Sequence, residues 1–156
     1  LAPDLSLTQL LSNITVSNGI AFSLEENIMY FADTPTGRIQ KFEFSQDFKK
    51  LHELDSNLIF NDVGVPDGAT MDSQNNYWSA RVRGNCIICI DMKNEKILKK
   101  INLPTATPTC LTFGGPDSSN LFVTSLRAEP INDSADGNLY KVETNTKGSK
   151  QLLSEI

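Results

Sequence analysis

The chain is poor in the residues that most often bind metals through nitrogen or sulfur. Among 156 residues there is one histidine, His52, and there are three cysteines. His52 falls on a predicted polar outer strand, and one histidine supports neither a histidine-based triad nor a multi-histidine zinc site within this chain. Cys86 and Cys89 form a C-x-x-C pair inside a strand-like run, where residues three apart point to opposite faces. We therefore expect both, together with Cys110, to be buried free thiols.

Long apolar runs and an excess of basic residues are also missing. No run approaches the roughly 18 apolar residues of a membrane span, and the formal net charge of −5 argues against nucleic acid. Lysine pairs at residues 49–50 and 99–100 fall on predicted outer strands, where lysine commonly protects a sheet edge. No signal peptide is visible. We expect no membrane or nucleic-acid partner and a cytoplasmic location, with export left open if the N-terminus is missing.

A recurring motif organises the chain. It reads N-G-I-A-F from Asn18, D-G-A-T-M from Asp67 and T-C-L-T-F from Thr109. A period of roughly 40–50 residues suggests propeller blades or a similar array. After each copy come an aromatic strand core, a third strand that follows a glycine, and a more polar fourth strand, with turn residues between them. Each repeat therefore predicts four short antiparallel strands, and the fold class is an all-β propeller.

The phase of the repeats predicts three blades, over residues 17–60, 61–104 and 105–156. Their inner strands should begin near Gly19, Gly68 and Cys110, be covered on both faces, and be accompanied by no long helix. Residues 1–16 start out of phase: residues 1–4 resemble the end of a third strand and residues 7–11 the fourth strand of a preceding blade. In the last blade the fourth strand is expected at residues 151–153. A closed propeller needs about four blades. We expect this partial domain to need its missing N-terminal half or a second copy, since two three-blade arcs make six blades.

Asn18 and Asp67 are the candidate metal ligands, because they hold the same position in successive repeats. Equivalent points of a circular array converge on its axis, and amide and carboxylate oxygens are the donors that a hard cation prefers. Each residue also has a simpler interpretation as a turn residue that bonds its own backbone. The spacing leaves both interpretations open.

Three longer strings resemble the regucalcin/gluconolactonase family, to which the luciferin-regenerating enzyme is similar. They read V-S-N-G-I-A-F-S from Val16, P-D-G-A-T-M-D from Pro66 and T-C-L-T-F-G-G from Thr109, and G-N-L-Y-K-V from Gly137 looks like the family's last conserved strand. The similarity runs the whole length of the chain but covers only about the C-terminal half of a family member. It implies a six-bladed propeller, of which about three blades are present here.

The resemblance also implies a site. In this family one divalent cation lies in the axial channel, and Asn18 and Asp67 match its asparagine and aspartate ligands. Calcium or zinc is expected first, with manganese or magnesium as alternatives. The implied reaction is hydrolysis of a sugar lactone such as gluconolactone. The cation polarises the lactone carbonyl, and Asp67 acts as ligand, as the base for the attacking water, or as both.

Other parts of the implied site are incomplete. Arg127 and Thr109 are candidate substrate-binding residues, although a surface arginine is the simpler interpretation of Arg127. The family's glutamate ligand and its substrate-binding arginine and asparagine have no counterpart here, so catalysis by the isolated chain is in doubt. Two alternatives stay open, namely a non-catalytic metal-binding protein of the regucalcin type and a protein-interaction propeller.

Overall fold

The structure, a computed structural model, describes residues 6–23, 26–47, 49–127 and 135–150. These residues form three antiparallel sheets and two short 3-10 helices, η1 (Thr34–Thr36) and η2 (Asn61–Val63). None of these helices is long and apolar enough to cross a membrane. The strands are β1 (Ser17–Ser23), β2 (Ile28–Asp33), β3 (Arg38–Phe44), β4 (Leu51–Ile59), β5 (Val65–Met71), β6 (Tyr77–Val82), β7 (Cys86–Asp91), β8 (Lys96–Asn102), β9 (Pro108–Gly114), β10 (Asn120–Ser125) and β11 (Leu139–Glu143).

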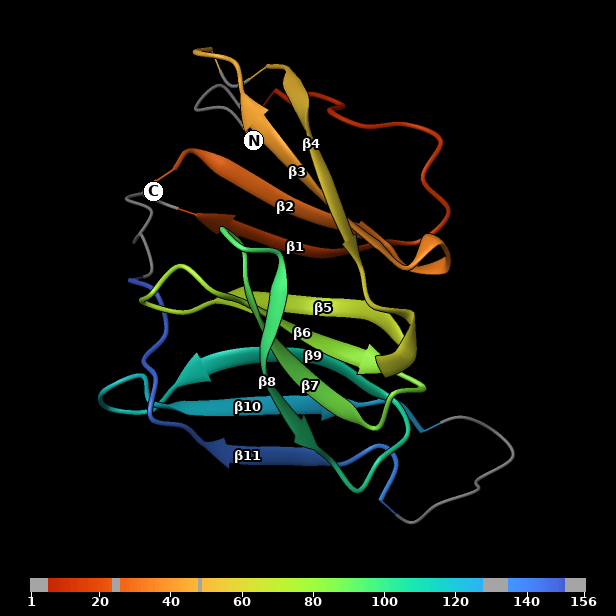
Figure 1. The fold of residues 1–156 in the computed structure, drawn as a ribbon, viewed down its shortest axis with the longest axis vertical. Helices are drawn as coiled ribbons and strands as arrows, with labels where there is room; N and C mark the ends of the chain where they lie inside the picture. The colour runs from red at the N-terminus through yellow and green to blue at the C-terminus, as the bar shows by residue number, and fades with distance from the viewer. Residues whose placement is uncertain (1–5, 24–25, 48, 128–134, 151–156) are drawn as a thin grey trace.

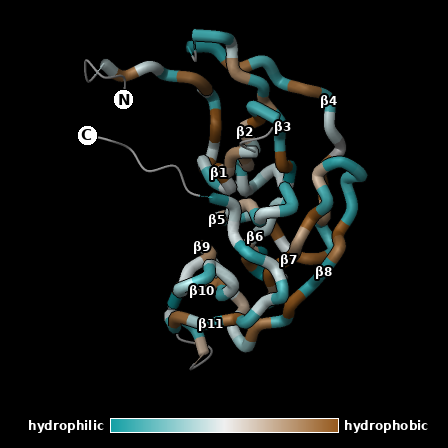
Figure 2. The backbone as a smooth tube through the Cα atoms, turned by 90° about the vertical axis from the view of Figure 1, so that its left-hand side faces the viewer, coloured by the Kyte–Doolittle hydropathy of each residue, from teal (hydrophilic) through white to brown (hydrophobic). Residues whose placement is uncertain are grey.

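The three sheets are stacked like the blades of a propeller (Figure 1). Within each sheet the strands follow the chain in order, β1 to β4, β5 to β8 and β9 to β11. The inner strands β1, β5 and β9 lie side by side, and the sheets fan outward from them (Figure 2). The predicted all-β propeller of antiparallel blades is confirmed, and the described residues contain no helix longer than three residues.

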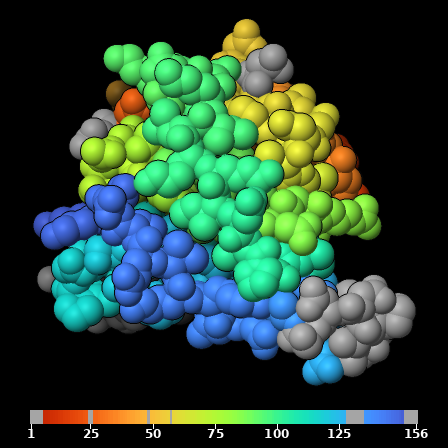
Figure 3. Space-filling view, turned by 60° about the horizontal axis from the view of Figure 1, so that its bottom comes forward, coloured from red at the N-terminus to blue at the C-terminus, as the bar shows by residue number. Residues whose placement is uncertain are grey.

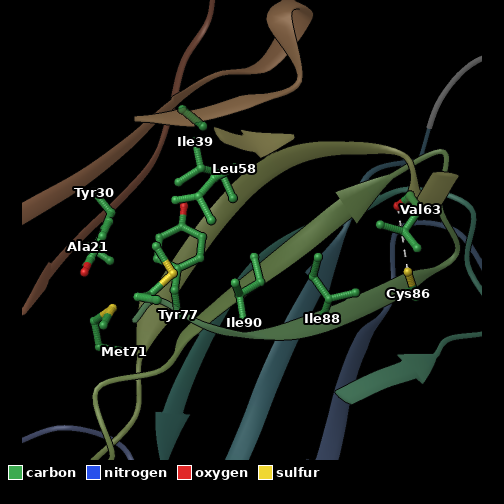
Figure 4. Packing of buried hydrophobic residues seen from close by; sticks show 12 residues of the cluster. Ala21, Tyr30, Ile39, Leu58, Val63, Met71, Tyr77, Cys86, Ile88 and Ile90 are labelled. Atoms are coloured by element: carbon green, nitrogen blue, oxygen red, sulfur yellow. Dashed lines mark hydrogen bonds between the residues drawn. The ribbon is translucent and has the colours of Figure 1, made fainter. Parts of the chain in front are cut away.

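Two hydrophobic cores hold the blades together, one on each face of the middle sheet. Side chains alternate between the faces of a strand, so Cys86 and Ile88 pack toward the first sheet, while Ile87 and Cys89 pack toward the third. The predicted opposite orientation of Cys86 and Cys89 is confirmed, and both are buried free thiols. Figure 4 shows the first of these cores, with the Cys86 thiol bonded to the carbonyl of Val63.

The inner strands are not all covered on both faces, contrary to our expectation. On β5, the inner strand of the middle sheet, no residue is exposed. On β1, however, Ile20 and Phe22 are 55% and 45% exposed, and on β9 Cys110 and Thr112 are exposed. The exposure of these residues follows from the positions of the first and third sheets. The first and third sheets each have a described neighbour on only one side, so alternate residues of their inner strands face solvent.

The N-terminal segment also differs from the prediction. Residues 7–11, expected as an outer strand of a preceding blade, form no strand. A strand requires a neighbouring strand to pair with, and the segment instead covers part of the open face of the first sheet, where Leu11 and Ile14 pack beside Phe31. The Asp33 carboxylate accepts hydrogen bonds from the backbone N–H groups of Thr15 and Val16, at 3.1 and 2.9 Å, and these bonds hold the end of the segment beside the first sheet. The strands expected at residues 1–4 and 151–153 lie outside the described residues.

Residues 147–149 form a strap across the second and third sheets that the sequence did not indicate. The backbone N–H of Ser73 donates to the Lys147 carbonyl at 2.8 Å, and the N–H groups of Gly148 and Ser149 donate to the carbonyls of Ser118 and Met71 at 2.9 and 3.1 Å. A cavity of about 590 Å³ lies beside the strap, at the far ends of β5 and β9. Figure 3 shows this C-terminal part of the chain in blue beside the green surface that includes β8.

The two-sided core generates a stability prediction. Ile88→Ala should lower the free energy of unfolding by about 2–5 kcal/mol, because it opens a cavity between the first two sheets where Ile88 is fully buried. Leu98→Ala on the outer strand β8 is the matched control; Leu98 is 50% exposed, and the change should stay within about 0.5 kcal/mol. Urea unfolding followed by circular dichroism measures both. Equal losses in the two variants would contradict this location of the core.

Candidate metal and substrate site

Two matched β-bulges carry the candidate ligands. The pairing of β1 with β2 shifts register between Asn18 and Ala21, and the pairing of β5 with β6 shifts between Pro66 and Ala69. A bulge adds a residue to one strand, bends it and re-aims a side chain. Asn18 pairs with Ala32 at the edge of the first bulge and Asp67 is an unpaired residue within the second, so both candidates lie near the beginnings of adjacent inner strands.

The glycine after each candidate ligand has a packing role. A Cβ on Gly19 would lie 2.9 Å from the Cβ of Ala32 and 3.2 Å from the carbonyl oxygen of Asp67. Gly19 also has φ of +57°, which favours glycine. A Cβ on Gly68 would lie 2.8 Å from both the Thr109 carbonyl oxygen and the Cys110 Cα. Glycine at these positions lets each inner strand approach the next.

The structure brings the side chains of Asn18 and Asp67 together. The Asn18 side chain lies close enough to the Asp67 carboxyl to lower the pKa of that carboxyl as a hydrogen-bonding group, and its Nδ2 donates to Thr34 Oγ1 at 3.1 Å. The two residues therefore share one location on adjacent blades, and neither is an isolated turn residue. Their role as metal ligands stays a prediction.

The environment of Asp67 disfavours its charge. Burial raises the pKa of its carboxyl, and the hydrogen bonds from the Asn18 side chain and the Gly68 backbone only partly oppose the rise. Only hydrogen bonds oppose this rise in the Asp67 pKa, and no lysine or arginine among the described residues does so. A half-buried carboxylate without a cationic partner suits a bound cation. Within the described ranges, however, no three His, Cys, Asp or Glu side chains form a metal-binding group, so Asn18 and Asp67 supply only part of a ligand set.

A cavity of about 350 Å³ lies beside this pair, where the three inner strands begin. The thiol of Cys110 opens into it, which corrects the expectation that all three cysteines are buried. The Cys110 sulfur lies 2.7 Å from the position where a Cβ on Gly68 would be, so the cysteine is beside the second sheet and is exposed because it lines this open cavity. The walls combine polar groups with the apolar side chains of the first sheet, and the lining residues are Ser17, Asn18, Gly19, Ile20, Phe31, Gly68, Ala69 and Cys110.

The two candidate substrate-binding residues are less directly placed. Thr109 begins the third motif beside Gly68, but its hydroxyl lies 2.9 Å from the hydroxyl of Thr124. Arg127 follows β10, is exposed and packs against Gly137. Neither residue lines the cavity, so their contact with a substrate remains a prediction.

Sequence reasoning missed one residue beside the site, Tyr77. Its hydroxyl donates to the carbonyl oxygen of Gly19 at 2.6 Å, across the boundary between the first two sheets. The sequence pattern places Tyr77 only in an aromatic strand core. A signal was present, because a tyrosine in a buried core position needs a partner for its hydroxyl.

The contact between Asn18 and Asp67 generates a prediction that needs no metal. Asn18→Ala should raise the pKa of the Asp67 carboxyl further, because it removes a hydrogen bond that lowers this pKa. Asn94→Ala is the matched control. In the unaltered chain the Asn94 side chain donates to the Asp91 carboxylate at 2.7 Å and lowers the pKa of Asp91, not that of Asp67. Carboxyl ¹³C NMR titration measures both aspartates. An unmoved Asp67 in Asn18→Ala would show that the two side chains are apart.

Relatives of the chain are about twice its length. The 6-deoxy-6-sulfogluconolactonase of Pseudomonas putida is 32% identical over 147 residues, which cover 90% of this chain and 50% of the relative. Regucalcin of Xenopus laevis is 30% identical over 131 residues, 80% of this chain and 42% of the relative. The solved structure of a calcium-binding protein, regucalcin, from Agrobacterium tumefaciens matches with a TM-score of 0.83 and 25% identity, over 96% of this chain and 52% of that one.

The chain thus spans about half the length of the curated relatives it matches. Residues 1–127 match the SMP-30/Gluconolactonase/LRE-like region. This match includes both candidate ligands and, at its end, Arg127, and it confirms the resemblance read from the sequence motifs. The chain belongs to the SMP-30/gluconolactonase/LRE-like family.

Proposed function

We propose that the chain supplies part of the active site of a divalent-metal-dependent sugar lactone hydrolase. The observation that carries this proposal is the meeting of the Asn18 amide and the Asp67 carboxyl at matched bulges of adjacent blades. It is supported by membership of a family whose relatives include a lactonase of a sugar derivative and regucalcins. The substrate class is a sugar lactone such as gluconolactone.

The residues present fit a hard divalent cation. Asn18 and Asp67 offer amide and carboxylate oxygens, which calcium and magnesium prefer and which zinc and manganese also accept. The half-buried Asp67 has a raised pKa, so a neighbouring cation would stabilise its charged form. The NH2 group of Asn18 donates to Thr34 and faces the Asp67 carboxyl. A cation shared by the two residues therefore requires the Asn18 amide to turn its oxygen toward the ion.

The chemistry divides between the cation and this chain. A bound cation would supply polarisation of the lactone carbonyl and a more acidic water. Asp67 serves as ligand, as base for the water that attacks the carbonyl carbon, or as both; the ring C–O bond then breaks and leaves a hydroxy acid. Asn18 orients the Asp67 carboxyl, while Ile20 and Phe31 give the cavity apolar walls. Thr109 and Arg127 contact substrate hydroxyls in this proposal.

A second candidate function is metal binding without catalysis. Two observations favour it. Regucalcins are among the relatives, and Asp67 belongs to no group of three or more His, Cys, Asp or Glu side chains that could hold a metal among the described residues. Hydrolysis of added gluconolactone separates this alternative from the lactonase. A propeller that only binds a protein partner would require no cation at all.

The Asp67 carboxylate is decisive for the metal proposal. Asp67→Ala should abolish binding of calcium and zinc, because it removes the only anionic ligand that we assign to this chain. Asp91→Ala, in a turn on the outer side of the middle sheet, is the control and should leave the affinity unchanged. Calorimetric titration of both metals measures the effect. Equal metal affinities of Asp67→Ala and the unaltered chain would contradict the proposed metal site. The proposed function is tested separately: removal of the metal by a chelator should abolish lactone hydrolysis.

We also propose that the chain acts within a larger ring. Ile20 and Phe22 of the inner strand β1 are about half exposed, and contiguous apolar surface of this kind is rare in isolated soluble domains. A missing N-terminal half or a second copy would cover it, and two three-blade arcs restore six blades. A second copy would still lack the family's glutamate ligand, so we expect weak metal binding and little lactonase activity from such a dimer.

Analytical ultracentrifugation tests the assembly. We expect the 17.2 kDa chain to self-associate, or to be a poorly cooperative monomer, in the absence of a completing half. Phe22→Ser should weaken self-association by removing apolar surface from the open face, and Leu98→Ser, on the outer strand, serves as the control. A monodisperse monomer that unfolds cooperatively and hydrolyses gluconolactone would show the proposal to be wrong.

A further inference from the structure

The boundary between the first two sheets contains a buried tyrosine whose hydroxyl bonds to backbone. Tyr77 of β6 is fully buried, and its ring meets that of Tyr30 edge to face at 5.7 Å. Figure 4 shows Tyr77 between the side chains of the two sheets, close to Ala21 and Met71. Its hydroxyl reaches the carbonyl oxygen of Gly19 at 2.6 Å. Burial raises the pKa of this hydroxyl, so it remains protonated and acts as a donor.

This hydrogen bond fixes the bulge that contains Asn18. Gly19 is the next residue along β1 and adopts φ of +57°. The Tyr77 hydroxyl lies 2.5 Å from the position where a Cβ on Gly19 would be, so the two groups are in close contact. Because Tyr77 belongs to the sheet that carries Asp67, its hydrogen bond sets the position of the Asn18 bulge relative to that sheet.

The bulge that contains Asp67 is anchored from the same strand. Arg81 is fully buried, and its Nη2 donates to the carbonyl oxygens of Phe60 and Gly64, at 2.9 and 2.6 Å. Its backbone pairs with Pro66, directly before Asp67. Desolvation lowers the pKa of the Arg81 guanidinium to about 10. Residues 77 and 81 point to the same face of β6, so one strand holds the backbone on both sides of the candidate site.

We propose that Tyr77 is a positioning residue for the site, and that its hydroxyl, by holding the Gly19 carbonyl, keeps the Asn18 amide against Asp67. The inference rests on the proposed function only where it concerns the metal. The contact between Asn18 and Asp67 that Tyr77 maintains exists without a cation, and this allows the two proposals to fail separately.

The test compares Tyr77→Phe with Tyr30→Phe. Each change removes one hydroxyl from the same core and leaves the ring. Tyr30 is the matched control because its hydroxyl bonds to Glu26 and not to the bulge. In ¹⁵N-labelled, metal-free protein we expect the side-chain amide signals of Asn18 to move in Tyr77→Phe and to stay in place in Tyr30→Phe. Unmoved Asn18 signals in Tyr77→Phe would overturn the proposal.

Calcium affinity gives the second readout, by NMR titration of calcium chloride into the same proteins. Tyr77→Phe should weaken calcium binding by on the order of tenfold, the usual effect of losing a group that orients a ligand. In an Asn18→Ala background the same change should have an effect below about twofold, because Tyr77 acts through Asn18. An equal loss in both backgrounds, or in Tyr30→Phe, would indicate a merely structural role and overturn the proposal.

Two further outcomes are informative. If the unaltered chain binds neither calcium nor zinc, the proposed function fails for this chain, while the Asn18 signals still decide the role of Tyr77. If Tyr77→Phe does not fold, the unaltered chain is measured instead. The hydroxyl proton of Tyr77 should then exchange slowly with water and lie close to the α protons of Gly19. A Tyr77 hydroxyl proton that exchanges rapidly, or that is not close to Gly19, would overturn the proposal.

Discussion

The close approach of the inner strands is the constraint on which the rest of the structure depends. Gly19 leaves room for the carbonyl of Asp67, and Gly68 leaves room for the backbone of Thr109 and Cys110. A side chain at either glycine would separate neighbouring blades at the ends of the strands that carry Asn18 and Asp67. The same contact therefore packs the blades and brings the candidate ligands together. A change in the packing of the blades would therefore also change the geometry of the candidate site.

Most of the blade architecture could be predicted because its signals are local and repeated. Strand cores, turn residues and the motifs that begin at Asn18 and Asp67 recur with a period of roughly 40–50 residues, and the structure has the expected strands from β1 through β11. The errors occur where a repeat lacks a neighbour. Residues 7–11 have no described strand to pair with, and Cys110 lines an open cavity beside the inner strands. Periodicity identifies a repeat but does not say whether the next repeat is present.

Long-range contacts of single atoms could not be predicted from the motifs. Tyr77 and Gly19 are 58 residues apart, and Arg81 reaches carbonyl oxygens 17 and 21 residues away. The strap at residues 147–149 depends likewise on backbone groups that no side-chain pattern specifies. A motif shows which residues occupy equivalent positions. The hydrogen bonds that place these residues come from β6, whose sequence resembles that of any apolar strand except for its buried hydroxyl and guanidinium groups.

The electrostatics of Asp67 link ring closure to metal binding. Burial already raises the pKa of this carboxyl when half of it remains accessible to water, and no cationic side chain of the described residues opposes that rise. Covering the open faces beside β1 and β9 would remove more water from the channel, which disfavours the charged carboxylate further. A divalent cation would reverse this effect and favour the charged carboxylate. The low dielectric that penalises an isolated charge also strengthens the attraction between that charge and a charge of opposite sign. Closing the ring and binding the cation are therefore expected to favour each other. The open arc holds the candidate ligands Asn18 and Asp67 near each other, but without the surroundings expected to make a cation bind tightly.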